Sequence, residues 1–261
     1  MSPDRYPDWK SFEFPAGGAD AGPAAFGADL SPASVLGACQ RGLVPLPAPD
    51  EFFRGLNQIR YEDQVADGTI AVVGDGRDDP YWVAWWSPDP RLVIGAGGVH
   101  LGRNVRQRLR RDGLSTTANA AFPVVAEACR ADREPRWLTD ALLGTLTELH
   151  AQGWAHSIEV WRDGDLVGGA MGIGIGGVLS GDSLFGRLPG AAAVAVADMA
   201  ARLAAAGGTV IDAQWDSPFL RSLGAVPVAR ERYLALLSGP AEPLPLPPGA
   251  LPARRLLAPA G

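Results

Sequence analysis

The segment from Trp154 to Arg187 constrains the fold more than any other part of the chain, because it predicts consecutive strands. Residues His156 to Trp161 alternate in the manner of a half-buried strand. The tight-turn sequence Arg-Asp-Gly-Asp follows, and Leu166 to Ile175 form the returning strand. A third strand is predicted from Val178 to Phe185. The segment therefore indicates a three-stranded meander.

Helices and further strands are predicted on both sides of the meander. Before it we expect a strand at 92–94, a basic helix at 100–111, a strand at 114–117, and helices at 120–130 and 139–152. After it we expect an alanine-rich helix at 190–206 that ends at a glycine pair, a buried strand at 209–212, a helical turn at 218–223 and a last strand at 226–237. This order predicts an α/β (α+β) fold with a mixed sheet.

The chain has 261 residues, which is enough for one large domain or two modest ones. We expect a small N-terminal domain at 1–82 and a larger domain at 83–237. A short helix should begin in the first domain with Ser31 as its N-cap. Residues 46–81 are acidic and are interpreted as an insertion around a short helix and a hairpin. The proline-rich residues 238–261 predict a loosely attached tail.

The net charge of −6 argues against nucleic-acid binding by the whole surface, but a local basic patch stays possible. Cys39 and Cys129 have no metal-ligand spacing and form no disulfide framework, so we expect a reducing, cytoplasmic setting. The polar N-terminus argues against a signal peptide. The apolar run 189–206 is interrupted by Asp198 and Arg202, which argues against a membrane span.

Short motifs occur in a fixed order along the chain. They lie at Gly27–Pro32, Gln40–Pro45, Trp85–Arg91, Trp137–Thr139, His156–Trp161, Gly181–Arg187, Ile211–Gln214 and Ser222–Ala225. In sequence and order, from about Phe26 to Tyr233, they resemble the motifs of the leucyl/phenylalanyl-tRNA–protein transferase family. The resemblance implies an acetyltransferase-like (GNAT-like) mixed sheet with flanking helices.

The resemblance also implies an activity. Family members move Leu or Phe from aminoacyl-tRNA to the N-terminal amine of proteins that begin with Arg or Lys, which marks those proteins for degradation. Met is a further candidate for the transferred amino acid. The partners would be aminoacyl-tRNA and an acceptor protein or peptide, with no membrane, and a monomer is expected. No metal or redox cofactor is implied, because the ester bond supplies the energy.

Asp212 and Gln214 are the candidate catalytic residues. They leave the end of a predicted buried strand, where α/β sheets place ligands, and alternation puts both on one face. Aminoacyl transfer needs loss of a proton from the amine and donors for the oxyanion. An amide is a poor base, so Gln214 would orient the amine while Asp212 polarises it or takes its proton. The resemblance assigns both as the catalytic pair; the alternative is a pair that caps the next helix.

Substrate-binding residues are also implied by the resemblance. Asp182 stands where the family has a Glu that recognises the basic N-terminal residue of the acceptor, although it could be an ordinary turn aspartate. Met171, Leu184 and Phe185 are candidates for the aminoacyl pocket. Trp137 would lie near the terminal adenosine of the tRNA. The alternative for the apolar residues is a role in the core.

The predicted basic helix carries Arg103, Arg106, Arg110 and Arg111, candidates for contact with the tRNA acceptor stem. Arg108 points away from the stripe that Arg103, Arg106 and Arg110 form on the helix. The alternative for the whole group of arginines is a solvated helix face.

Three rival functions stay open at this level. Arg187, Gly190 and Ala192 fit the phosphate-binding loop of acetyl-CoA-dependent acetyltransferases, ahead of a helix N-terminus. Departures from the family's motifs near the expected site, such as Ser217-Pro218-Phe219 in place of Asn-Asp-His, allow transfer to a small-molecule amine instead. A tRNA-binding protein without turnover is the third.

Overall fold

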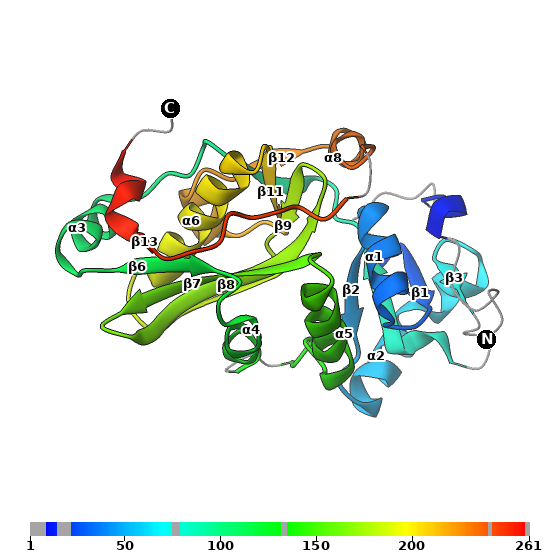
Figure 1. Ribbon diagram of the computed structural model, residues 1–261. Helices are drawn as coiled ribbons and strands as arrows, with labels where there is room; N and C mark the ends of the chain where they lie inside the picture. Colours follow the sequence, from blue (N-terminus) through cyan, green and yellow to red (C-terminus); the bar gives the residue numbers. More distant parts are fainter. Residues whose placement is uncertain (1–8, 15–21, 75–78, 132–134, 240–241, 259–261) are drawn as a thin grey trace. The chain divides into compact units, whose positions relative to one another are not determined.

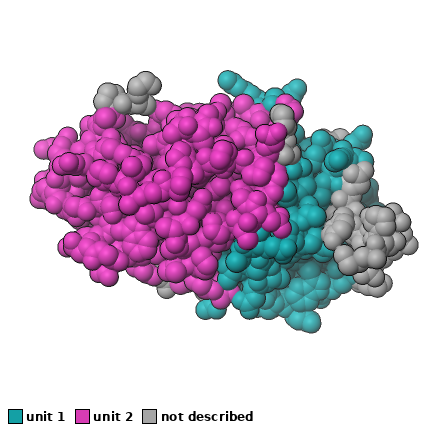
Figure 2. Space-filling model, in the orientation of Figure 1, with its two compact units in different colours: residues 1–90, 133–148, 229–235 teal, residues 91–132, 149–228, 236–261 magenta. Residues whose placement is uncertain are grey.

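The computed structural model describes residues 9–14, 22–74, 79–131, 135–239 and 242–258. The chain forms two compact units (Figure 2). Unit 1 comprises residues 1–90, 133–148 and 229–235, and unit 2 comprises residues 91–132, 149–228 and 236–261. Both contain helices and strands, which confirms the predicted mixed α/β class.

Unit 1 contains a four-stranded sheet in the order β2-β4-β1-β3. Its strands are β1 (Ala25–Gly27), β2 (Val44–Pro47), β3 (Ala71–Val73) and β4 (Val83–Trp86). The helices that begin in this unit are α1 (Pro32–Gln40), α2 (Glu51–Ala66), α5 (Asp140–Ala151) and α8 (Arg230–Leu236). The predicted cap of α1 is confirmed, because the Ser31 side chain accepts a hydrogen bond from the backbone of Ser34.

The interpretation of residues 46–81 as a short helix and a hairpin is wrong. The helix α2 is 16 residues long, and the Asp50 side chain caps it by accepting a hydrogen bond from Phe53 at 3.0 Å. The strand β3 pairs in parallel with β1, so it forms one edge of the sheet and not one arm of a hairpin. Tyr61 on α2 and Ile70 join Phe26 in the small core of the unit.

Unit 2 is built on a nine-stranded sheet in the order β12-β5-β11-β9-β8-β7-β6-β13, with β10 paired to β8 (Figure 1). Its strands are β5 (Arg91–Gly95), β6 (Ser115–Ala118), β7 (Ala155–Arg162), β8 (Asp165–Ile175), β9 (Val178–Ser180), β10 (Ser183–Gly186), β11 (Val210–Gln214), β12 (Val226–Val228) and β13 (Leu251–Pro252). Its helices are α3 (Arg103–Arg111), α4 (Phe122–Arg130), α6 (Ala191–Ala205) and α7 (Pro218–Ser222), with the 3-10 helix η5 (Ala253–Leu257).

The predicted hairpin of β7 and β8 is confirmed, but β7 is not half-buried. Residues 155–160 are all buried, because α6 covers one face of the hairpin and α4 covers the other (Figure 1). Two glycines of β8 show the close approach: a Cβ at Gly168 would lie 2.6 Å from Ala191 on α6, and a Cβ at Gly169 would lie 3.3 Å from Val125 on α4. The alternation in the sequence therefore records two different buried environments.

The predicted third strand divides into β9 and β10, which are separated by Gly181 and Asp182. β9 lies beside β11, whereas β10 pairs along β8. This break releases Asp182 from the regular ladder at the edge shared by the two strands.

The last predicted strand is also wrong in part, because β12 covers only Val226–Val228 and the helix α8 follows. The proline-rich tail is not loosely attached. Leu244, Leu246 and Ala253 are buried in the core of unit 2, and β13 pairs with β6. Proline removes backbone donors but does not prevent the leucines between the prolines from packing.

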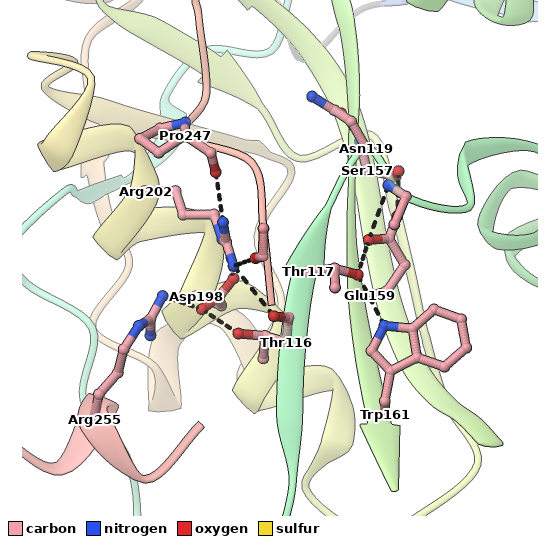
Figure 3. Close-up of polar contacts among 12 residues, drawn as sticks. Thr116, Thr117, Asn119, Ser157, Glu159, Trp161, Asp198, Arg202, Pro247 and Arg255 are labelled. Carbon is pink, nitrogen blue, oxygen red and sulfur yellow. Dashed lines mark hydrogen bonds and ion pairs between the residues drawn. The ribbon is translucent and has the colours of Figure 1, made fainter. Parts of the chain in front are cut away.

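A buried carboxylate anchors this tail (Figure 3). Asp198, which is fully buried on α6, binds Arg202 at 2.6 Å, the Thr116 hydroxyl at 2.8 Å, and Arg255 of the tail. Arg202 in turn donates to the carbonyls of Pro247 and Gly249. The two polar residues that interrupt the apolar run of α6 therefore hold the C-terminal segment in place.

Candidate functional site

The strand β11 carries the two candidate catalytic residues, and its backbone is irregular between them. β11 is antiparallel to β5 and parallel to β9, with a register shift between Asp212 and Gln214. Gln214 has a φ of +61°, in the left-handed region that L-residues rarely adopt. Because of this bulge, simple alternation does not describe where the two side chains point, and each binds a different partner.

Asp212 is held by Arg91, the first residue of β5. Arg91 Nε donates to Asp212 Oδ1 at 2.8 Å and Arg91 Nη2 donates to Oδ2 at 2.6 Å, which is a bidentate pair. Both side chains are only 1% exposed. The backbone N–H of Gln214 also donates to Asp212 Oδ1, at 2.9 Å. The Asp212 carboxylate is therefore fixed on both oxygens.

Gln214 is held by Asp182. The Gln214 Nε2 donates to Asp182 Oδ1 at 2.7 Å, across the break between β9 and β10. The backbone N–H of Asp182 donates to the carbonyl of Met171 at 3.0 Å, which fixes the break against β8. Arg91, Asp212, Gln214 and Asp182 thus form one continuous series of contacts, which we call the polar chain.

Asp182 is the titratable end of the polar chain. The pKa of its carboxyl is raised from 3.8 to about 6, mainly by burial and also by the nearby charge of Asp212. Hydrogen bonds from Ser180 and Gln214 and the charge of Arg91 lower the same pKa and offset part of the effect. A carboxyl that titrates close to neutral pH beside a fixed amide is a common feature of catalytic and binding sites.

Sequence reasoning did not assign a role to Arg91. Its signal was its place at the end of the Trp85–Arg91 motif, but the partner, Asp212, lies 121 positions away in sequence. A contact between residues so far apart in sequence depends on the pairing of β5 with β11, which no local pattern predicts.

The aminoacyl-pocket candidates lie on β8 and β10. Met171 is 1% exposed and pairs in register with Ser183. Phe185 lies on the α4 side of the sheet, where a Cβ at Gly169 would be 2.8 Å from its ring. Leu184 packs on the core that contains α6. Phe185 and Leu184 therefore face opposite sides of the sheet, and the fourth candidate, Trp137, belongs to unit 1.

The basic helix is present as α3, and it begins at Arg103 instead of the predicted His100. Arg103, Arg110 and Arg111 are exposed and Arg106 is half-buried. Arg108, which was expected to lie apart from them, pairs with Asp112 at 3.1 Å. The buried Leu109 anchors the opposite face of the helix, so α3 presents a largely basic outer surface.

The loop before α6 uses its arginine internally. Arg187 Nη1 donates to the carbonyl of Leu166 at 3.0 Å, and its guanidinium lies over the ring of Phe185 at 5.3 Å. Gly190, at the start of α6, has a φ of +87° and would clash mildly with Val105 if it carried a Cβ. These contacts give the Arg187–Ala192 pattern a packing role.

A second polar cluster surrounds Glu159 on β7 (Figure 3). This fully buried carboxylate accepts from the hydroxyls of Ser157, at 2.5 Å, and of Thr117, and from the backbone of Ala120 and Ala121 at the start of α4. These bonds join β7 to β6 and to the turn between β6 and α4, which indicates a structural role.

His156 is also held inside the sheet. Its Nδ1 lies 3.1 Å from Asn119 Nδ2, and burial lowers the pKa of the imidazole to about 4. A histidine that stays neutral over the physiological range is suited to packing and not to proton transfer at neutral pH.

Among the described residues, no helix has the length and apolar character needed to cross a bilayer.

Comparison with known proteins relates the chain to one family. The family model described as "Leucyl/phenylalanyl-tRNA protein transferase" matches residues 93–238. Proteins named leucyl/phenylalanyl-tRNA–protein transferase are similar to this chain. The Chromohalobacter salexigens protein is 46% identical over 158 residues, which are 59% of this chain and 62% of that protein. The Novosphingobium aromaticivorans protein is 41% identical over 192 residues, 72% of each chain. The Saccharophagus degradans protein is 34% identical over 216 residues, 82% of this chain and 76% of that protein.

The matched region thus spans less than two thirds of the Chromohalobacter protein and more of the other two. Three members of the polar chain, Asp182, Asp212 and Gln214, lie inside the part of the chain that the family model matches.

Proposed function

This chain belongs to the leucyl/phenylalanyl-tRNA–protein transferase family, and on that premise we propose that it is an aminoacyltransferase. It moves leucine or phenylalanine, with methionine as a further candidate, from tRNA to the N-terminal amine of a protein that begins with Arg or Lys. The product is thereby marked for degradation. The observation that carries the proposal is the family match over residues 93–238, which includes Asp182, Asp212 and Gln214.

The proposed reaction needs no metal or redox cofactor. The acceptor amine attacks the ester carbonyl, a C–N bond forms, and the C–O bond to the terminal ribose breaks. The amine loses a proton and the leaving ribose hydroxyl gains one. The residues must therefore hold the amine, guide its proton and stabilise the oxyanion.

The polar chain suggests how these tasks are divided. The Gln214 amide donates one N–H to Asp182, which leaves its carbonyl oxygen as a possible acceptor for the incoming amine. Asp182 pairs with the basic side chain of the acceptor. Asp212 is 1% exposed and bound by Arg91, so we assign it the orientation of Gln214 and not direct removal of the proton.

The remaining parts of the proposal concern the tRNA and the fold. The exposed arginines of α3 contact phosphates of the acceptor stem. The aminoacyl-pocket candidates remain Met171, Leu184 and Phe185, but Leu184 and Phe185 face opposite sides of the sheet, so only one of these two lines the pocket. Trp137 stacks near the terminal adenosine. Unit 2 carries catalysis in an acetyltransferase-like fold, supported by the β7–β8 hairpin between α4 and α6. The enzyme acts as a cytoplasmic monomer.

The test is transfer of radiolabel from charged Leu-, Phe- and Met-tRNA to peptides with N-terminal Arg or Lys. The same peptides with acetylated N-termini are the matched control, and a parallel reaction contains labelled acetyl-CoA. We expect tRNA-dependent label in the free-amine peptides alone. Acetyl transfer without any transfer from tRNA would refute the proposal.

A further inference from the structure

The structure assigns Arg91 a positioning role in aminoacyl transfer: it fixes Asp212 and, through Asp212, aims the Gln214 amide at Asp182. This inference rests on the proposed function. Arg91 is only 1% exposed, so it is not available to contact substrate itself. It acts on residues that are proposed to do so, across the pairing of β5 with β11.

The first step of the argument is the cost of burying this ion pair. Both partners are 1% exposed, and removing two charges from water commonly costs as much as their attraction returns. A buried pair is therefore weak evidence for a stabilising role and suggests that specific geometry is what it provides. The bidentate arrangement, at 2.8 and 2.6 Å, leaves the carboxylate a single orientation.

The second step is the backbone of Gln214. A φ of +61° at a glutamine is a strained backbone conformation that persists only where the surroundings enforce it. The Gln214 N–H bond to Asp212 Oδ1, at 2.9 Å, is such a constraint. Because Arg91 fixes this same oxygen, the guanidinium determines where the Gln214 backbone turns and where its side chain points.

The third step concerns Asp182, which is the last residue of the polar chain. Gln214 Nε2 reaches Asp182 at 2.7 Å, and the charged groups that act on this carboxyl include both Asp212 and Arg91. Removing the guanidinium would remove a charge that lowers the pKa of Asp182 and would raise this pKa above about 6. Loss of Arg91 should therefore disturb both the geometry and the titration of the site.

The experiment compares Arg91→Met and Arg91→Lys with Arg202→Met. Arg202 is the matched control, because it is also a buried arginine in an ion pair with an aspartate, at 2.6 Å, in the same unit. At a temperature where all proteins are folded, Arg91→Met should lower kcat about 100-fold, as expected for misplaced reacting groups, with the KM for tRNA unchanged. Arg91→Lys keeps the charge without the planar fork and should lie between Arg91→Met and wild type. Arg202→Met should keep the wild-type kcat.

A double variant tests whether Arg91 and Asp212 act as one unit. Asp212→Asn should lower kcat to a similar extent, and Arg91→Met combined with Asp212→Asn should be little worse than either alone. Independent losses that multiply would contradict the positioning role.

A readout that needs no activity separates this inference from the proposed function. In NMR spectra, the side-chain amide of Gln214 should move toward the position of a solvated amide in Arg91→Met and stay in place in Arg202→Met. An unmoved Gln214 amide in Arg91→Met overturns the inference, whether or not the wild-type protein transfers amino acids. Absent transfer by the wild type, with the amide shift observed, overturns only the proposed function.

Discussion

The side-chain amide of Gln214, at the end of β11, lies 2.7 Å from a carboxylate oxygen of Asp182, in the break between β9 and β10. The contact forms because the third strand of the meander breaks at Asp182 and β11 bulges before Gln214. Both irregularities occur where ladder geometry would otherwise keep the two side chains apart. The pair, backed by Asp212 and Arg91, is therefore a local departure from regular sheet structure that creates a polar site.

We predict that Asp182 determines binding of the basic acceptor. Asp182→Asn keeps the shape but removes the charge, so the KM for Arg and Lys peptides should rise about 10- to 100-fold, the range expected for one charge-assisted hydrogen bond. Steady-state kinetics with saturating charged tRNA measure this. Asp163→Asn, at an 88% exposed turn position, is the control and should behave as wild type. Equal KM values for Asp182→Asn and wild type would remove Asp182 from the acceptor site.

The raised pKa of Asp182 predicts a pH dependence of stability. Well below pH 3.8, the ordinary pKa of this group, the carboxyl is protonated in both the folded and the unfolded protein and contributes nothing. As pH rises toward about 6, the unfolded state loses this proton first, so the folded protein becomes less stable relative to the unfolded protein. Above that pH the cost is constant. Asp182→Asn should therefore gain stability relative to wild type between pH 4 and pH 7.

Urea unfolding of both proteins at these two pH values measures the effect as a difference of differences, which cancels the contributions of other groups. A stability difference between the two proteins that does not change with pH would show that this carboxyl has an ordinary pKa.

We predict that the basic face of α3 contributes to tRNA affinity. Arg103→Glu and Arg106→Glu should weaken binding, and each should reduce the salt slope by about one unit if the replaced arginine neutralises one phosphate. Arg108→Glu is the comparison, since Arg108 already pairs with Asp112. Filter binding at several salt concentrations measures the slope. Equal slopes for all three variants and wild type would exclude α3 from the tRNA interface.

The anchor of the C-terminal segment should be important for stability. Arg202→Met removes one of the two arginines that pair with the buried Asp198, and breaking a buried ion pair costs about 3–5 kcal/mol of unfolding free energy. Arg162→Met, which removes an exposed pair with Asp163, should cost less than about 1 kcal/mol. Denaturant titration compares the two variants. Similar losses in both would show that the Asp198 cluster does not hold the tail.

Local patterns predicted the elements that have strong local signals. The β7–β8 hairpin has turn residues between two apolar strands, and α6 ends at the predicted glycine pair, with Gly207 at a φ of +81°. The tail was mispredicted because the leucines that bury it are spaced by prolines, and because Asp198, which anchors it, lies on a distant helix. The composition shows that the tail is rich in proline, but it does not reveal the ion pair between Asp198 and Arg255 that anchors the tail.

The candidate site shows the same division. Asp182, Asp212 and Gln214 could be chosen from motifs, because each stands in a short recognisable segment. Their arrangement could not be predicted, because the bulge at Gln214 interrupts the expected alternation and Arg91 reaches Asp212 only through the pairing of β5 with β11. Long-range strand pairing, which sets these contacts, is not encoded in any single segment.

The central claim is tested most directly by the Gln214→Ala variant in the tRNA-to-peptide transfer reaction, measured in single turnover with tRNA binding followed in the same samples. The account predicts that wild-type protein moves the labelled amino acid to an Arg peptide, and that Gln214→Ala binds charged tRNA normally but transfers at least about 100-fold more slowly. Transfer by Gln214→Ala at the wild-type rate would contradict the account.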